Sequence, residues 1–119
     1  MAEVHAWWSW VMIVGNALAG LWALVAHVDE RFRTRLLWWA TAVVQVTIFV
    51  QIAFGVWLVA VDDIEVDDLH LFYGFVAGIT VGLIYSYRSQ LAHRIFLLYG
   101  FGGLFLAGLG LRAIILPPT

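Results

Sequence analysis

The chain has 119 residues, of which 64% are hydrophobic and 12% are charged, and its formal net charge is −2. A soluble domain of this size could not bury so much apolar surface, so the composition indicates a protein that is solvated by lipid. The chain has no cysteine, which excludes disulfides, thiolate nucleophiles and cysteine-ligated metals, and it has no basic patch that would favour a nucleic-acid partner.

Four apolar stretches are long enough to cross a bilayer as helices, which takes about 20 residues each. They cover residues 7–26, 36–61, 69–87 and 95–116. Backbone groups find no water in the hydrocarbon, so these stretches are expected to be helical, and their short connections make consecutive helices antiparallel neighbours. The sequence therefore predicts a single all-α transmembrane domain, residues 1–119, folded as an up-down four-helix bundle.

The charged residues between the spans predict the orientation of the bundle. Three arginines follow the first span, and Arg88 and Arg94 lie between the third and fourth spans. The 62–68 segment, between the second and third spans, has five acidic residues and no basic one. Arginine-rich loops stay in the cytoplasm. We therefore expect a multi-pass protein of the cell (inner) membrane with both termini on the outer side, and the acidic segment there as either a solvated connector or a docking surface.

Uncharged polar residues lie near the middle of three spans: Asn16 in the first, Gln51 in the second and Thr80 in the third. No Asp, Glu, Lys or Arg falls near the middle of a span, which argues against a proton pump or an ion-coupled transporter. We expect the three polar side chains to make interhelical hydrogen bonds. The alternative is that they form a small polar site or a water path.

Small residues recur at helix-packing spacing in the last two spans. The third span contains Gly74, Gly78 and Gly82 at every fourth position, and the fourth contains Gly103 and Gly110. Small residues let helix backbones approach closely in lipid. We therefore expect tight helix contacts at these glycines, with another span of this chain, a second copy or a different subunit as the partner.

The four histidines fall into two pairs, one at each end of the predicted bundle. His5 and His70 lie at the outer ends of the first and third spans, and His27 and His93 lie at the inner ends of the first and fourth. The first and third helices of an up-down bundle are diagonal, so His5 and His70 could meet across its end. Paired imidazoles are common axial ligands of haem iron. His5 and His70 are therefore the candidate haem ligands, and His27 and His93 are expected to be unliganded.

One sequence pattern resembles a known family. The stretch "QIAFG", followed by "HLFYG", resembles a helix pair of haem A synthase and similar b-type haem membrane proteins, over residues 51–74 of this chain. The resemblance implies that His70 is a haem ligand. In that family an acidic residue stands three positions before a His-Arg pair, whereas here Glu3 stands two positions before His5 and Ala6 follows it. The resemblance therefore does not supply the second ligand.

Three classes of function fit these features. The first expectation is a small non-enzymatic accessory or assembly subunit of a larger membrane complex, such as a respiratory one, with lipid and other membrane subunits or a second copy as partners, and without a cofactor. The alternative is a b-type haem electron-transfer protein that uses His5 and His70 as axial ligands. A small oligomeric channel or transporter comes third. No catalytic site and no metal-ion site is expected, because no nucleophile–base pair or trio of metal ligands falls on one helix face.

Overall fold

The computed structural model describes residues 2–115, which form four long helices. They are α1 (Ala2–Val28), α2 (Arg35–Ala60), α3 (Asp68–Tyr87) and α4 (Ile95–Ile115), with single 3₁₀ turns η1 (Glu30–Phe32) before α2 and η2 (Ala92–Arg94) before α4. These described residues contain no strand. By length and composition, all four helical segments could cross a membrane. The prediction of an all-helical protein with four such helices is therefore confirmed.

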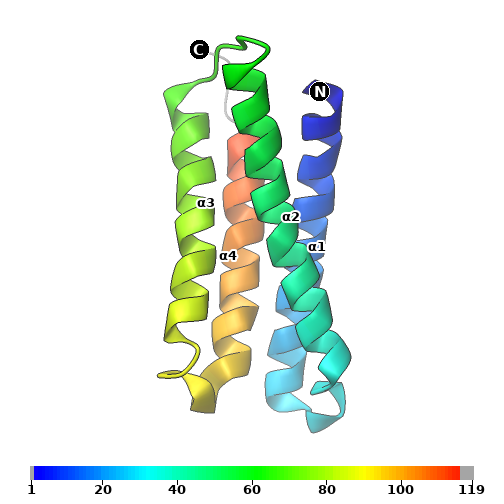
Figure 1. Cartoon of the computed structure of the whole chain (residues 1–119). Coiled ribbons are helices and arrows are strands. Elements are labelled where there is room, and N and C mark those ends of the chain that lie inside the picture. The colour runs from blue at the N-terminus through cyan, green and yellow to red at the C-terminus, as the bar shows by residue number, and fades with distance from the viewer. Residues whose placement is uncertain (1, 116–119) are drawn as a thin grey trace.

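The helices run alternately up and down, so α1 begins and α4 ends at the same end of the bundle (Figure 1). We call this end, which also holds the connection between α2 and α3, the N-terminal end. Helix α1 packs most extensively on α4, α2 packs on α1, and α3 packs on α4, whereas α2 and α3 touch each other only sparsely. Helices α1 and α3 are therefore diagonal, and the bundle is most loosely packed between α2 and α3.

The first helix begins earlier than the hydropathy pattern predicts. It starts at Ala2, whereas the expected apolar span starts at residue 7. Hydropathy marks the part of a helix that suits hydrocarbon, and it does not mark the helix end itself. His5 consequently lies in the first turns of α1 and is held by a regular helix. The other described boundaries fall within two residues of the expected spans, and residue 116 lies outside the described residues.

Side-chain caps explain where the second and third helices begin. The Thr34 hydroxyl accepts a hydrogen bond from the Leu37 backbone N–H, at the start of α2. The Asp67 carboxylate accepts one from the Leu69 N–H, at 3.0 Å, at the start of α3. These N–H groups are among those that the first turn of a helix leaves unpaired. The cap at Asp67 fixes the point at which the chain enters α3, three residues before His70.

Glycines bring the backbones of α1 and α4 into direct contact. A Cβ atom at Gly103 would lie 2.9 Å from the carbonyl oxygen of Asn16 and 3.0 Å from the Cα of Gly20, and one at Gly20 would lie 2.8 Å from the carbonyl oxygen of Gly100. Nearer the N-terminal end, a Cβ at Gly110 would lie 2.5 Å from the Cε of Met12. The structure therefore places Gly103 at a backbone contact between α1 and α4, and Gly110 against the Met12 side chain of α1.

The glycine row of α3 lies in looser surroundings. A Cβ at Gly78 would lie 3.3 Å from the Cδ1 of Ile52, while one at Gly74 or Gly82 would have no neighbour within 4 Å. Gly82 is exposed, and Gly74 is half-buried. The regular spacing shows that one face of a helix carries small residues, but it does not show what packs against that face. Within this chain, the close helix contact is between α1 and α4. The glycines of α3 instead face the cavity or the outside of the bundle.

Arginine side chains organise the connection between α1 and α2 at the opposite end of the bundle. Arg33 donates hydrogen bonds to the backbone carbonyls of Ala26 (2.7 Å) and His27 (2.8 Å), at the C-terminus of α1, and its guanidinium lies 4.8 Å from the centre of the Phe96 ring. The hydrogen bonds from the neighbouring Arg31 side chain lower the pKa of Asp29. These contacts satisfy helix-end carbonyls and join the α1–α2 connection to α4.

Candidate functional site

A cavity of about 770 Å³ occupies the N-terminal end of the bundle. All four helices and the α2–α3 connection line it, and most of its lining is apolar. Its volume falls within the range of about 300–1,000 Å³ that is typical of small-molecule and cofactor sites. Its lining includes His5, Gln51, Gly55, His70, Gly74 and Ala113. The cavity is therefore large enough for a cofactor and is built mainly from hydrophobic side chains.

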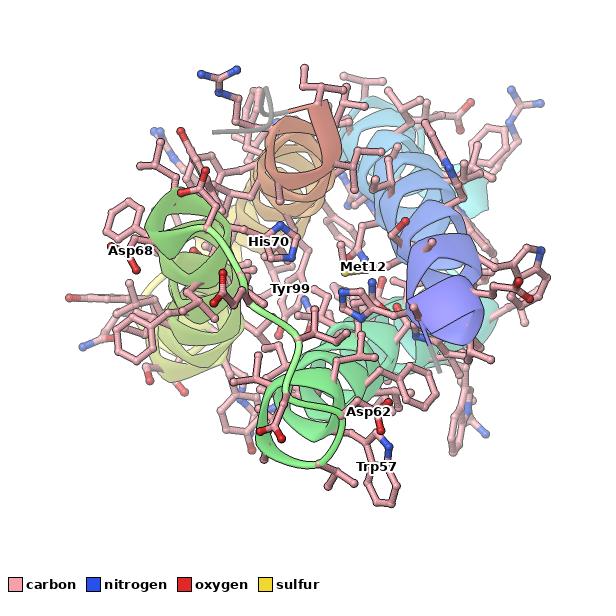
Figure 2. All side chains as sticks on the ribbon, turned by 90° about the horizontal axis from the view of Figure 1, so that it is seen from above. Met12, Trp57, Asp62, Asp68, His70 and Tyr99 are labelled. Carbon is pink, nitrogen blue, oxygen red and sulfur yellow. The ribbon has the colours of Figure 1, made fainter. Side chains whose placement is uncertain are left out.

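Two histidines face each other across this cavity. His5 comes from α1 and His70 from the diagonal helix α3, and the centroids of their rings lie 6.1 Å apart, with the ring planes at 65°. Figure 2, which looks onto the N-terminal end, shows the His70 side chain pointing into the space between the helices. The structure thus brings together the two histidines that the sequence singled out, although they are 65 residues apart in the chain (70 minus 5).

One hydrogen bond determines which nitrogen of His70 is free. Its Nδ1 lies 3.2 Å from the backbone carbonyl oxygen of Ala113, on α4. A carbonyl oxygen can only accept, so the Nδ1 of His70 donates this bond and Nε2 is the ring nitrogen that stays available to a ligand. Metal-binding histidines are commonly oriented by such a bond. The Ala113 carbonyl therefore orients the His70 ring in the way that a second partner orients a metal-binding histidine.

His5 is held through its backbone, and its ring has an unpaired nitrogen. The Gln51 side-chain amide Nε2 donates a hydrogen bond to the His5 carbonyl oxygen, at 2.7 Å. The Gln51 residue is only 9% exposed. Within the described part of the chain, the His5 Nδ1 and the Gln51 Oε1 are both buried and have no hydrogen-bond partner. Buried polar atoms are normally paired, because leaving them unpaired costs about 1–3 kcal/mol. The site therefore offers polar atoms that remain to be satisfied.

Two glycines shape the walls beside these histidines. A Cβ at Gly55 would lie 3.3 Å from the Cε1 of His5, which is tight contact, so the small residue lets the imidazole lie against α2. Gly74 lies one helical turn after His70 and lines the cavity, and a Cβ there would meet nothing within 4 Å. The cavity wall formed by Gly74 therefore leaves free space one turn after His70, and a flat ligand could lie there.

The remaining candidate polar residues do not join this site. Asn16 is 1% exposed, and its Nδ2 donates to the carbonyls of Met12 (2.8 Å) and Val44 (3.3 Å). The Thr80 hydroxyl donates to the Val76 carbonyl within its own helix, at 2.7 Å. Asn16 and Gln51 thus each bond a backbone carbonyl of a neighbouring helix, whereas Thr80 bonds only within its own helix among residues 2–115. Residues 2–115 contain no group of three His, Cys, Asp or Glu residues that could hold a metal ion by itself.

Sequence reasoning missed two components of the site. The carbonyl of Ala113 orients His70, but a backbone acceptor on another helix leaves no signal in the residue type. The connection between α2 and α3 supplies Ile64, Glu65, Val66 and Asp67 to the cavity lining, whereas its acidic composition suggested only a connector or a docking surface. The chain turns back between α2 and α3 and so brings this segment to the cavity. This placement depends on the path of the backbone and not on the residue types.

Comparison of the chain with protein-family models, with curated proteins and with solved structures gives no match. The site combines two imidazoles, an apolar cavity and unpaired buried polar atoms. It therefore offers imidazole nitrogens and apolar walls to a bound group.

Proposed function

We propose that this chain is a membrane protein that binds a b-type haem through His5 and His70 and transfers single electrons at the N-terminal end of the bundle. The observation that carries the proposal is the 6.1 Å separation of the two imidazole centroids inside an apolar cavity. Imidazole nitrogens bind first-row metals at about 2 Å, as they do zinc, so two such bonds span about 4 Å. The centroid separation of 6.1 Å is close to that span plus the distance from each ring centre to its nitrogen.

The residues around the histidines fit such a group. The Ala113 carbonyl orients the His70 ring, and Gly74 leaves open space beside it. Haem iron bound by two imidazoles supplies reversible one-electron chemistry. The chain's own part is to orient two neutral imidazoles and to keep water out with apolar walls.

The visible absorption spectrum of the protein, purified in mild detergent, tests this proposal. We expect a Soret band in the oxidised sample, and sharpened α and β bands after reduction with dithionite. His70→Ala and His5→Ala should each remove or strongly alter these bands, because each deletes one axial ligand. His93→Ala is the matched control, because this exposed histidine lies at the opposite end of the bundle and should leave the spectrum unchanged.

A colourless but folded protein that also takes up no added haemin would refute the proposal. Far-UV circular dichroism and the elution volume in detergent establish that each variant is folded. Bands that survive unchanged in both His5→Ala and His70→Ala would also refute it, since haem would then be held elsewhere. A full loss in His93→Ala would move the site to the opposite end of the bundle.

A second function, as an accessory subunit of a larger membrane complex, is supported by the outward-facing glycines. Gly82 on α3 and Gly108 on α4 are exposed, and a Cβ at either position would have no neighbour within 4 Å. Small residues on a lipid-facing surface allow another helix to approach closely. Purification in mild detergent should then retain a partner or a second copy, and Gly82→Leu should release it while the monomer stays folded. Unchanged assembly in Gly82→Leu would contradict this role for α3.

We further propose that the N-terminal end of the bundle faces the outer side of the cell membrane. The arginines between α1 and α2 and between α3 and α4 all lie at the opposite end, and positively charged loops stay in the cytoplasm. The absence of cysteine from the chain permits a clean test. In intact cells, a membrane-impermeant thiol reagent should label Asp63→Cys but not Ser89→Cys. The reverse pattern would invert the proposed orientation.

A further inference from the structure

The two imidazoles of the site are supported unequally. The Nδ1 of His70 has an acceptor in the Ala113 carbonyl, at 3.2 Å, whereas the Nδ1 of His5 is buried without a partner among the described residues. A neutral imidazole whose Nδ1 has no acceptor is free to place its proton on either nitrogen. His5 would then present a bare Nε2 only part of the time. A second axial ligand therefore needs an acceptor for its Nδ1–H.

The missing acceptor is already present beside His5. The carboxamide of Gln51 is tied to His5 by the 2.7 Å bond from its Nε2 to the His5 carbonyl oxygen. Only the NH₂ group of an amide can donate to a carbonyl, so this bond fixes which way the amide is turned. The Oε1 is left over as an acceptor, and it is buried and unpartnered in the same cavity wall. One orphaned donor and one orphaned acceptor thus belong to two residues that already contact each other.

We infer that Gln51 is the positioning residue for His5: one water bridges the Nδ1–H of His5 and the Oε1 of Gln51, which make no direct hydrogen bond in the structure, so that the Nε2 of His5 is left as the ligand nitrogen. The inference rests on the proposed function for the identity of the ligand, but the pairing of Gln51 with His5 belongs to the chain itself. It satisfies both orphaned atoms at once, as buried polar groups require. It also gives His5 the same kind of support that Ala113 gives His70.

The first test needs no haem. In the protein labelled with ¹⁵N-histidine, the ring nitrogen shifts of His5 should report a neutral ring with the proton on Nδ1. Gln51→Leu removes the acceptor, and we expect His5 to shift toward a mixture of tautomers. Gln51→Glu keeps an acceptor oxygen in place of Oε1, and we expect it to retain the Nδ1–H form. Gln45→Leu is the matched control, because it removes an amide from the same helix at a residue that does not line the cavity.

Gln51→Glu distinguishes two roles of Gln51: orienting the His5 ring through Oε1, and holding the His5 backbone through the bond from Nε2. An ionised carboxylate cannot donate to the His5 carbonyl, so a purely structural role of the Nε2 bond would make the Glu and Leu variants equally different from the wild type. Equal shifts in the two variants, or His5 shifts in Gln51→Leu identical to those of the wild type, would overturn the inference. These outcomes are read on His5 itself, so they stand whether or not the protein binds haem.

A second test uses the haem-loaded protein. An acceptor on Nδ1 makes an imidazole a stronger electron donor to its metal and so favours the oxidised state. We expect Gln51→Leu to raise the reduction midpoint potential while it keeps the Soret band, and Gln45→Leu to leave the potential unchanged. A potential in Gln51→Leu equal to that of the wild type would overturn the inference but leave the haem proposal intact. A wild-type protein that takes up no haem would refute the proposed function, and the histidine shifts would still decide the role of Gln51.

Discussion

The contact between α1 and α4 yields a sharp prediction, because it is made by backbone atoms that cannot move aside. Gly103→Ala adds one methyl group that would lie 2.9 Å from the Asn16 carbonyl oxygen and 3.0 Å from the Gly20 Cα. Ordinary contact begins at 3.4 Å, so the two helices must separate by about 0.5 Å (3.4 minus 2.9) to admit it. The same substitution at Gly108, on the same helix, meets no atom within 4 Å.

The two substitutions differ only in this contact, so their difference gives its energy. Replacing glycine by alanine favours a helix by about 0.5–1 kcal/mol in either position. Overpacking a tight contact costs about 1–3 kcal/mol. We therefore expect Gly108→Ala to be neutral or slightly stabilising, and Gly103→Ala to be less stable than Gly108→Ala by about 1–3 kcal/mol. The separation of the helices should also move His5 relative to His70 and weaken retention of any bound haem.

Unfolding in mixed micelles by increasing amounts of sodium dodecyl sulfate, followed by far-UV circular dichroism, measures this difference. The free energy of unfolding is compared among the wild type, Gly103→Ala and Gly108→Ala under one set of conditions. If Gly103→Ala unfolds within about 0.5 kcal/mol of Gly108→Ala, the reasoning is refuted, because that is the spread expected of substitutions that disturb no contact. The α1–α4 backbones would then not be in direct contact.

Three further predictions concern other contacts. Asn16→Ala should lower the free energy of unfolding by about 0.5–2 kcal/mol, measured in the same micelles, because it removes the side-chain hydrogen bond from α1 to the Val44 carbonyl of α2; unchanged stability would show that this interhelical bond contributes nothing. Arg33→Ala should cost about 1 kcal/mol through loss of its bonds to the α1 carboxyl end, whereas Arg94→Ala, with no such bond among the described residues, should cost little. Glu65→Gln should raise the midpoint potential of the haem-loaded protein, because it removes a negative charge from the cavity lining and so disfavours the oxidised state; a lowered potential would contradict the placement of this loop.

The helices and their number could be read from the sequence, because lipid imposes a local rule. Every backbone polar group must be satisfied within its own helix, and the length of the apolar stretch then defines the span. The pairing of His5 with His70 could also be anticipated, since an up-down bundle brings the first and third helices to the same end. The start of α1 could not, because a helix continues beyond its apolar part.

The packing faces were much harder to anticipate from the sequence. Glycines in α1, α3 and α4 have similar spacing, yet only those of α1 and α4 bring two backbones into contact, while Gly82 faces outward. The rotation of each helix about its axis decides which glycines face a neighbouring helix. The spacing of the glycines in the sequence does not reveal that rotation. Asn16 and Gln51 were likewise expected to bond across helices, but the backbone carbonyls that they reach depend on the relative height of α1 and α2.

The four apolar helices, their short polar connections and the histidines near the helix ends can all be recognised in the amino-acid sequence. The packing of the helices places two of these imidazoles in one cavity, sets the Ala113 carbonyl against His70 and brings Gln51 to His5, and none of these contacts is visible in the sequence. The difference arises because the forces involved act over different distances. Hydropathy and backbone hydrogen bonding act within a helix, whereas a ligand site depends on the distances and rotations between helices, which arise when all four pack together.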